Sequence, residues 1–290
     1  MKPAPECALC LLRWFYDKAA VGLQREQKFK LFREISKVLV ENFYPNTNLG
    51  RASNTIIEQV AEFISVAAPE YKDIKAKSNK LVKDVLSRAS NFVMQSKTDE
   101  ERFLKAVWLA TLGNVAPLAK LKKAMTFEEA LNVMEGKGPL PHVIGDIFSC
   151  VQTSQRILYI SDNAGEIGFD SLLISELKQM GAKVTLAVKA KPLFEDATLE
   201  DAEFFLLHNL ADEVLGIKGF FVPDAMDNRL DQALKESDLV MVKGTGNYEA
   251  VEGELKGKAI IYMLKVKCGP VAHSTGTKAG EFVARLDAPT

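Results

Sequence analysis

Residues 156–166 read RILYISDNAGE, and this stretch decides the fold class. Its first five residues, Arg156–Ile160, form an apolar, β-prone run that predicts a buried strand. The polar residues SDNAGE predict a turn, and Ile167–Met180 then has the character of a helix. Strand, polar turn and helix in this order form the unit in which open α/β sheets carry their ligand sites.

Strand-like and helix-like runs continue to alternate after this unit. Near-continuous apolar strands fit burial on both faces, which is typical of parallel sheets. The pattern therefore predicts an α/β fold with a Rossmann-like, doubly wound and mostly parallel sheet. The predicted strands are Arg156–Ile160, Lys183–Val188, Glu213–Ile217, Leu239–Val242 and Ala259–Leu264, and the predicted helices are Ile167–Met180, Leu199–Asn209 and Asn228–Glu236.

The part of the chain before this sheet has helical periodicity instead. Thr98 and Glu101 form a capping box, and glycines and prolines in residues 136–141 break the pattern. We therefore predict an N-terminal all-helical domain or cap over residues 1–150 and a Rossmann-like domain, carrying the site, over residues 151–290. Apolar residues recur at helical spacing in Leu11–Val21, Phe29–Phe43, Ile56–Ala67 and Leu81–Val93.

The composition is that of a globular protein without a strong charge bias. Of the 290 residues, 47% are hydrophobic and 26% are charged, and the formal net charge is −1. Because there is no strongly basic stretch, nothing favours nucleic acid or an anionic membrane as a partner. The N-terminus lacks the apolar core of a signal peptide, and no apolar run approaches the roughly 18 residues that span a bilayer. We therefore expect a cytoplasmic protein.

The cysteines and histidines give weaker signals. Cys7 and Cys10 have the C-x-x-C spacing of redox and metal sites, but zinc sites usually add a second pair or histidines. The pair also precedes a helix-like run, which disfavours a thioredoxin-like motif. A zinc or redox role for Cys7 and Cys10 is therefore a minor alternative.

Polar clusters follow four of the predicted strands. They comprise residues 162–166, 189–198, 243–249 and 265–269, which combine carboxylates, an amide, lysines and glycine-rich turns. Because the carboxyl ends of parallel strands share one edge of a sheet, we expect the clusters to converge. Carboxylate and amide oxygens suit Mg²⁺ or Mn²⁺, while lysines and backbone N–H groups suit a phosphate. The mixture predicts a site for a divalent metal and a phosphate.

Simpler and competing interpretations apply to the same residues. Asp162 and Asn163 also suit a turn or a helix cap. Residues 244–249 begin like a G-x-G-x-x-G dinucleotide motif but end in Glu249, and the sequence contains no P-loop. A phospho-aspartate mechanism usually needs a second acid two residues after the nucleophile, where this chain has Ala164.

The order of these motifs resembles that of the metal-dependent damage-control phosphatases, a family also called acidic-residue-methyltransferase-like. A C-x-x-C ahead of helices is followed by DNAGEI-x-FD, KP-x-x-x-DAT-x-EDA, KG-x-GN-x-E and K-x-KC, so the match covers nearly the whole chain. The resemblance implies a helical domain packed on a Rossmann-like domain. It also implies a divalent metal (Mg, Mn, Co or Ni) and hydrolysis of small phosphate monoesters, such as sugar phosphates or damaged cofactor precursors, by a metal-activated water.

The resemblance implies roles for individual residues. Asp162, Asn163 and Asp196 would hold the metal. From the place of Glu166 at the start of the predicted helix, we further expect it to orient a metal-bound water or to support the metal ligands. Lys267, or alternatively Lys265, matches the family's phosphate-binding lysine. The expected catalytic residues are Asp162, Glu166 and Lys267, and the expected substrate- or phosphate-binding residues are Asn114, Lys243, Gly246, Asn247 and Lys267.

One segment departs from the family pattern, and two rival functions fit the fold. Relatives of the short prokaryotic and archaeal branch tend to carry GNIIDF, whereas residues 113–118 here read GNVAPL. If that missing acid shapes the pocket, the substrate differs from theirs. The rivals are S-adenosylmethionine-dependent carboxyl methylation and non-catalytic binding of a metal or phosphometabolite. The expected partner is a small phosphorylated metabolite, and an oligomer is compatible with the sequence.

Overall fold

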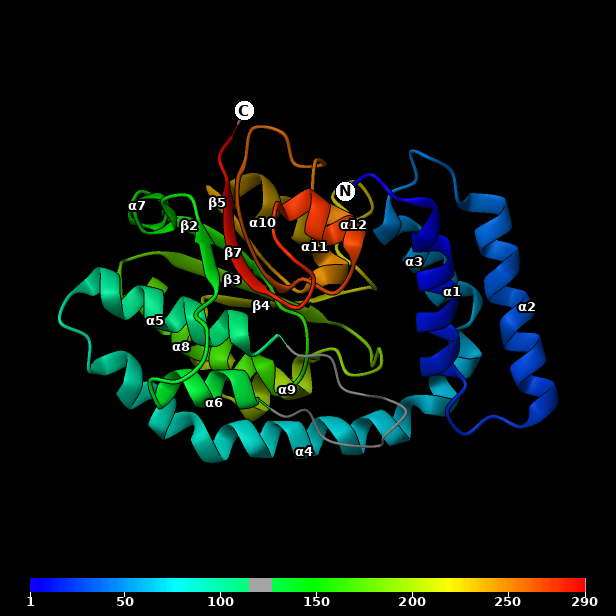
Figure 1. The fold of residues 1–290 in the computed structure, drawn as a ribbon, viewed down its shortest axis with the longest axis horizontal. Helices are drawn as coiled ribbons and strands as arrows, with labels where there is room; N and C mark the ends of the chain where they lie inside the picture. The colour runs from blue at the N-terminus through cyan, green and yellow to red at the C-terminus, as the bar shows by residue number, and fades with distance from the viewer. Residues whose placement is uncertain (115–126, 290) are drawn as a thin grey trace.

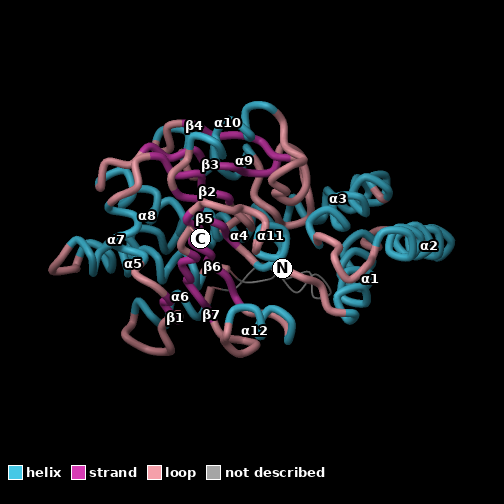
Figure 2. The backbone as a smooth tube through the Cα atoms, turned by 90° about the horizontal axis from the view of Figure 1, so that it is seen from above, coloured by secondary structure: helices cyan, strands magenta, loops and turns pink. Residues whose placement is uncertain are grey.

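The computed structural model describes residues 1–114 and 127–289, which are built around one seven-stranded sheet. Across the sheet the strands follow the order β1-β7-β6-β5-β2-β3-β4, which Figure 2 shows from one edge to the other. The strands are β1 His142–Ile144, β2 Arg156–Ile160, β3 Lys183–Lys189, β4 Glu213–Ile217, β5 Leu239–Lys243, β6 Ala259–Lys265 and β7 Phe282–Asp287.

The strand order reverses at the centre of the sheet. Neighbouring strands are parallel, except that β6 and β7 pair antiparallel. From β2 the chain continues outward to β3 and β4, and it then returns to β5 on the other side of β2. In an open α/β sheet, a crevice for ligands lies at the carboxyl ends of the two strands that flank such a reversal. The predicted doubly wound, mostly parallel sheet is confirmed.

Helices surround the sheet and extend beyond one end of it. In Figure 1, α1, α2 and α3 stand together at that end, and the long helix α4 runs from them toward α5. The helices are α1 Pro5–Ala19, α2 Arg25–Asn42, α3 Leu49–Gln59, α4 Ala61–Met94, α5 Asp99–Leu112, α6 Glu128–Met134, α7 Ile147–Gln152, α8 Glu166–Gln179, α9 Leu199–Phe204, the 3₁₀ helix η2 Leu207–Asn209, α10 Asn228–Glu236, α11 Thr245–Val251 and α12 Gly269–Thr275.

Alternate residues of each central strand enter two apolar cores, one on each face of the sheet. Leu158 and Ile160 of β2 belong to a core that includes residues of α1, α10 and α11. Ile157 and Tyr159 belong to a second core that includes residues of α5 and α8. Burial on both faces explains why these strands are apolar along their whole length.

Most predicted elements are confirmed with shifts at their ends, but the predicted helix Leu199–Asn209 is interrupted. It forms the short helix α9 and the 3₁₀ helix η2, with Leu206 in a left-handed conformation between them. β2 and β4 begin and end where predicted, and β3, β5 and β6 each extend one residue further. The predicted helix Ile56–Ala67 is divided at Val60, so that residues 56–59 end α3 and residues 61–67 begin α4. The predicted helix Leu81–Val93 lies within the same 34-residue helix α4, which continues through Pro69. The Thr98 side chain caps α5 as expected, accepting a hydrogen bond from the Glu101 N–H at 3.1 Å.

The division of the chain at residue 150 stays a prediction. β1 and α7 precede that point, yet β1 pairs with β7 of the sheet. Helix α5, from the helical half, packs against α8, β6 and β7. Within the described residues, no helix combines the length and apolar character needed to cross a membrane.

Candidate active site

The turn after β2 carries Asp162 and Asn163 at the carboxyl end of the sheet, where the strand order reverses. The Ser161 hydroxyl donates to the Ala187 carbonyl of β3 at 2.8 Å and fixes the start of this turn. Gly165 has a φ of 72°, which lets the chain bend into α8, and its N–H donates to Asn79 Oδ1 of α4 at 2.6 Å. The acid and the amide are therefore held on a turn fixed from both sides.

The loop after β3 brings Asp196 to the same place. Asn163 and Asp196 face each other in an isolated antiparallel bridge. The Ala164 N–H donates to the Glu195 carbonyl at 2.9 Å, and the Ala197 N–H donates to the Asp162 carbonyl at 2.8 Å. The three residues expected to hold a metal thus lie on two segments joined by backbone hydrogen bonds.

Asn114, just after α5, connects the helical half to this acidic cluster. Its Nδ2 donates to Asp162 Oδ2 at 2.8 Å and to Glu166 Oε2 at 3.0 Å. Its Oδ1 accepts a hydrogen bond from the backbone N–H of Lys265, at the end of β6, at 3.0 Å. Asn114 is fully buried, so one amide links α5, the β2 turn, α8 and β6. Its expected place beside the site is observed, and its contact with substrate stays a prediction.

Lys243, the last residue of β5, lies behind the cluster without exposure to solvent. Its Nζ is 2.6 Å from Glu166 Oε1 and 2.5 Å from Asp170 Oδ1. Burial lowers the pKa of Lys243, but the two carboxylates outweigh burial and hold the pKa above its ordinary value. Lys243 therefore neutralises buried carboxylates in this structure, and its predicted role in binding phosphate stays a prediction.

Gly244 follows Lys243 and lets the end of β5 approach the Asp162 carboxylate closely. Its φ is +83°, and a Cβ at this position would lie 2.0 Å from Asp162 Oδ2. No side chain fits in that space. The glycine-rich turn after β5 thus places backbone directly against the predicted metal ligand.

The other residues of this turn support the backbone. Asn247 is fully buried, and its Nδ2 donates to the carbonyls of Ser161, at 3.1 Å, and Lys243, at 2.9 Å. Gly246 packs against Phe220, whose ring would be 2.4 Å from an added Cβ. Asn247 therefore ties the ends of β2 and β5 together, and the contact of Gly246 and Asn247 with substrate stays a prediction.

The structure separates the two candidate lysines, of which one ends β6 and the other follows it. Lys265 forms an ion pair with Glu129 of α6 at 3.0 Å. Lys267 is exposed, and its charge partly opposes the rise that burial causes in the pKa of Glu249 on α11. No contact between Lys267 and the acidic cluster is observed within the described residues, so its phosphate-binding role stays a prediction.

Negative charge is concentrated around the predicted ligands. Burial, followed by the charges of nearby carboxylates such as Asp162, raises the pKa of Glu166 to about 7, although Lys243 opposes this shift. Burial and Asp162 likewise raise the pKa of Asp196 to about 7 against the opposing effect of Lys189. A cation placed between Asp162 and Asp196 would reverse this repulsion.

The donor atoms suit a partly hydrated divalent ion. Asp196 Oδ2 is buried without a hydrogen-bond partner and lies 3.4 Å from Lys189 Nζ. Among the described residues, no group of three His, Cys, Asp or Glu side chains is arranged to hold a metal ion. Two carboxylates and one amide nevertheless match Mg²⁺, which commonly takes one or two carboxylates and fills its shell with water and phosphate. Asp162, Asn163 and Asp196 therefore fit the implied metal.

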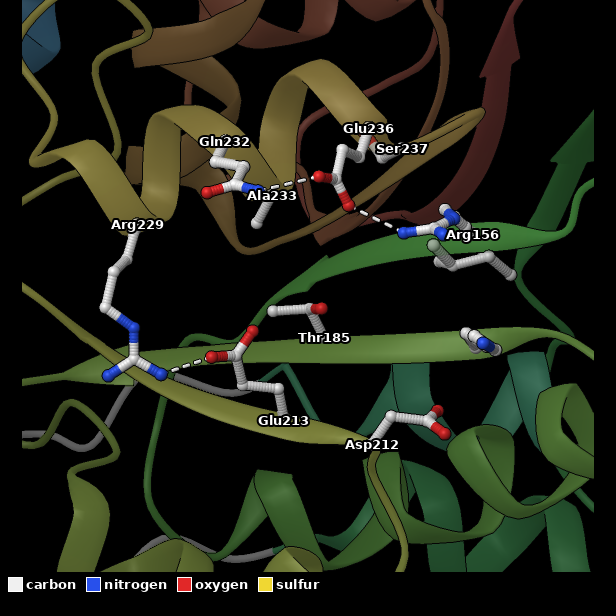
Figure 3. A pocket seen from close by; sticks show the side chains of 11 residues that line it. Arg156, Thr185, Asp212, Glu213, Arg229, Gln232, Ala233, Glu236 and Ser237 are labelled. Atoms are coloured by element: carbon white, nitrogen blue, oxygen red, sulfur yellow. Dashed lines mark hydrogen bonds and ion pairs between the residues drawn. The ribbon is translucent and has the colours of Figure 1, made fainter.

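A cavity of about 440 Å³ lies elsewhere, at the amino ends of β2 and β3 (Figure 3). Arg156 pairs with Glu236 there at 2.6 Å, and Arg229 pairs with Glu213. Because these charges already neutralise one another and ligands of open α/β sheets bind at the opposite edge, we assign no chemistry to this cavity.

Three cysteines share a small cavity of about 50 Å³ that is lined by residues of α1, α11 and the start of α12. Cys7, Cys10, Cys268 and Glu249 line it. Burial raises the pKa of all three thiols, that of Cys10 to about 11. Protonated thiols react slowly, which disfavours the redox role considered from the C-x-x-C spacing.

The sequence matches the family model of the damage-control phosphatase ARMT1-like domain over residues 4–283. The chain belongs to this family. A damage-control phosphatase of Archaeoglobus fulgidus is 32% identical over 99% of both chains. A damage-control phosphatase of Pyrococcus horikoshii is 29% identical, with 98% of this chain and 97% of the relative covered.

A solved structure carries the same fold. The crystal structure of a DUF89 family protein from Pyrococcus horikoshii aligns with a TM-score of 0.80 and 26% identity, and 98% of each chain is covered. The family and fold predicted from the motifs are thus confirmed.

Two charged residues of the site were not among the predicted site residues. Asp170 shares Lys243 with Glu166, and Lys189 lies beside Asp196. Glu166 and Asp170 are four residues apart on one helix, so both carboxylates lie on the same face. This spacing is the sequence feature that indicates Asp170 as a neighbour of Glu166. Lys189 ends β3, but a lysine at a strand end does not reveal by itself whether it is buried.

Proposed function

We propose that this chain is a metal-dependent phosphatase that hydrolyses small phosphorylated metabolites, such as sugar phosphates or damaged cofactor precursors. The observation that carries the proposal is the pair of buried carboxylates, Asp162 and Asp196, joined at the reversal of strand order. The two relatives named damage-control phosphatases support it. We expect the reaction to take place in the cytoplasm.

Asp162, Asn163 and Asp196 would hold the metal, which when bound supplies an activated water and charge neutralisation for a phosphate oxygen. Asn114 fixes the Asp162 carboxylate by donating a hydrogen bond to Oδ2. The other oxygen, Oδ1, does not take part in this contact. Lys243 keeps Glu166 and Asp170 from adding their full charge to the site. Exposed Lys267 would contact the phosphate of the substrate.

The first test measures phosphate release from sugar phosphates, phosphopantetheine and p-nitrophenyl phosphate with Mg²⁺, Mn²⁺, Co²⁺ or Ni²⁺. We expect release that chelator abolishes, and a loss of at least about 100-fold in kcat/KM for Asp162→Ala, because charge stabilisation at such sites has this magnitude. Asp84→Ala, an exposed carboxylate on α4, is the matched control and should retain activity.

Wild-type turnover by Asp162→Ala would show that the site is misassigned. No release with any metal, from protein that binds metal, would instead favour the methyltransferase or the non-catalytic function. Binding of labelled S-adenosylmethionine then separates those two.

A further inference from the structure

Lys18 of helix α1 is a buried lysine that contacts the segment carrying Asp196. Lys18 is 6% exposed and forms an ion pair with Glu195, which is 4% exposed. Glu195 immediately precedes Asp196 in the chain. A residue of the first helix thus contacts the direct neighbour of a predicted metal ligand.

The surroundings make this ion pair specific. Lys18 Nζ lies 4.9 Å from the ring centroid of Trp14, 5.6 Å from that of Phe194 and 5.8 Å from that of Tyr71. Aromatic faces attract a cation, and more strongly where water is excluded. Glu195 Oε2 is buried without a hydrogen-bond partner, so the contact of Oε1 with Lys18 carries the charge of this carboxylate.

The backbone of the segment is also constrained. Phe194 has a φ of 48°, a left-handed conformation that is unfavourable for a residue with a large side chain. Its ring meets those of Trp14 and Tyr71 edge to face, with centroids 5.3 Å and 5.2 Å away. The Asp196 N–H closes a turn onto the Leu193 carbonyl at 3.0 Å. Contacts with α1 and α4 therefore hold a strained turn that leads directly into Asp196.

We propose that Lys18 is a positioning residue for the metal site, which fixes the Asp196 carboxylate through the contacts of α1 with Glu195 and Phe194. This inference rests on the proposed function, because it assumes that Asp196 binds metal. It makes helix α1, which contributes none of the predicted ligands, part of the support of the site.

If the Lys18–Glu195 pair acted on the metal only through its charges, the variants would change metal affinity in a different way. Removing a positive charge near a cation site would tighten metal binding through space, and removing a negative charge would weaken it. Loss of positioning weakens binding in both cases. Lys18→Met therefore distinguishes the two explanations, because positioning predicts weaker binding where the charge alone predicts tighter binding. The double variant removes both charges together, so it leaves the net charge near the site unchanged.

The experiment measures Mn²⁺ affinity by calorimetry, without substrate, and folding by circular dichroism. We expect the dissociation constant to rise about tenfold in Lys18→Met, in Glu195→Gln and in the double variant, and Lys18→Arg to restore most of the affinity. A tenfold change corresponds to about 1.4 kcal/mol. The double variant leaves no unpaired buried charge, so it is the one best able to fold.

The matched control is Arg102→Met with Glu176→Gln, which removes an ion pair of 2.6 Å between α5 and α8, away from the predicted ligands. It should bind Mn²⁺ like the wild type. Wild-type or tighter affinity in any folded variant that lacks the Lys18–Glu195 pair would overturn the proposal. Wild-type protein that fails to bind Mn²⁺ would refute the metal site itself, and this inference with it.

Discussion

The orientation of the Asp162 carboxylate is fixed by its neighbours, which the sequence motif alone does not indicate. Asn114 and Asn163 both donate to its Oδ2 at 2.8 Å, and the backbone of Gly244 lies against the same carboxylate. An acid held in one orientation loses little conformational freedom when it binds a ligand, which favours affinity. The direction of this side chain is therefore set before any metal or substrate arrives.

Gly244→Ala should damage the site directly. The added methyl group would lie 2.0 Å from Asp162 Oδ2, so either the carboxylate or the end of β5 must move. We expect a destabilisation of roughly 1–3 kcal/mol, from overpacking and backbone strain, and a loss of at least about tenfold in Mn²⁺ affinity. Urea unfolding and calorimetry measure the two effects.

Gly253→Ala is the control for this substitution. Gly253 has a similar φ of +80°, but an added Cβ would have no atom within 4 Å. It should share the cost of backbone strain and retain Mn²⁺ affinity. Equal affinity in the two variants would show that contact with Asp162 does not matter.

At this scale the sequence predicted which residues gather but not how each one is used. Strand ends placed Asp162, Asn163 and Asp196 at one edge, because parallel strands require it. The sequence did not show that Lys243 is buried, because that depends on Glu166 and Asp170 of a helix packed against it. Lys18 carried no signal, since its partner Glu195 is distant in the chain.

Helices α4 and α8 approach closely at Gly168, where α8 begins. A Cβ on Gly168 would lie 2.6 Å from both Phe205 Cε1 and Val82 Cγ1. This contact sets the distance between α4 and the start of the helix that carries Glu166.

Gly168→Ala should therefore force the elements apart. Overpacking of this kind costs typically 1–3 kcal/mol, and we expect a loss of stability of about that size in urea unfolding. Gly269→Ala, in α12, is the control: nothing lies within 4 Å of its added Cβ, so its stability should stay within about 0.5 kcal/mol of the wild type. A stable Gly168→Ala variant would mean that the two helices adjust freely.

Elements with a strong pattern of their own were predictable, and elements defined by their neighbours were not. β2, β3, β5 and β6 are apolar runs that need burial on two faces, and they were found from sequence together with the partly buried edge strand β4. β1 has three residues, all exposed, and β7 ends in partly exposed residues, so neither carries that pattern. The short helix α11 follows Gly244, and the short helix α12 begins with Gly269 and Pro270, residues that indicate only breaks when they are taken from sequence.

The N-terminus, α11 and the segment after β6 meet around Glu249. The amino group of Met1 donates to the carbonyls of Glu249, at 3.2 Å, and Glu252, at 2.6 Å. Burial raises the pKa of Glu249 to about 7, although Lys267 and the N-terminal amine oppose the shift. Distant parts of the chain therefore share one titratable group.

Stability should fall as this group ionises. Between pH 4.5, the ordinary pKa, and about pH 7, the folded state holds a proton that the unfolded state releases. The contribution of the protonated Glu249 to the free energy of unfolding is therefore fully present below pH 4.5. It is lost as the pH rises to about 7. Glu249→Gln removes this dependence. Urea unfolding at several pH values should show the variant gaining roughly 1–3 kcal/mol on the wild type between pH 5 and 8. Parallel profiles would show that the pKa of Glu249 is not raised.

The position of β7 has a consequence for the order in which the protein is made. β7 lies between β1 and β6, yet it is synthesised from residues 282–287, long after β1 at residues 142–144. While the chain emerges from the ribosome, the turns that carry Asp162 and Asp196 are complete early. The edge of β6 that pairs with β7 stays unpaired until β7 has left the ribosome. An unpaired strand edge invites pairing with other chains. Translation that stalls shortly before β7 should thus yield a nascent chain that has its acidic turns but is prone to aggregate.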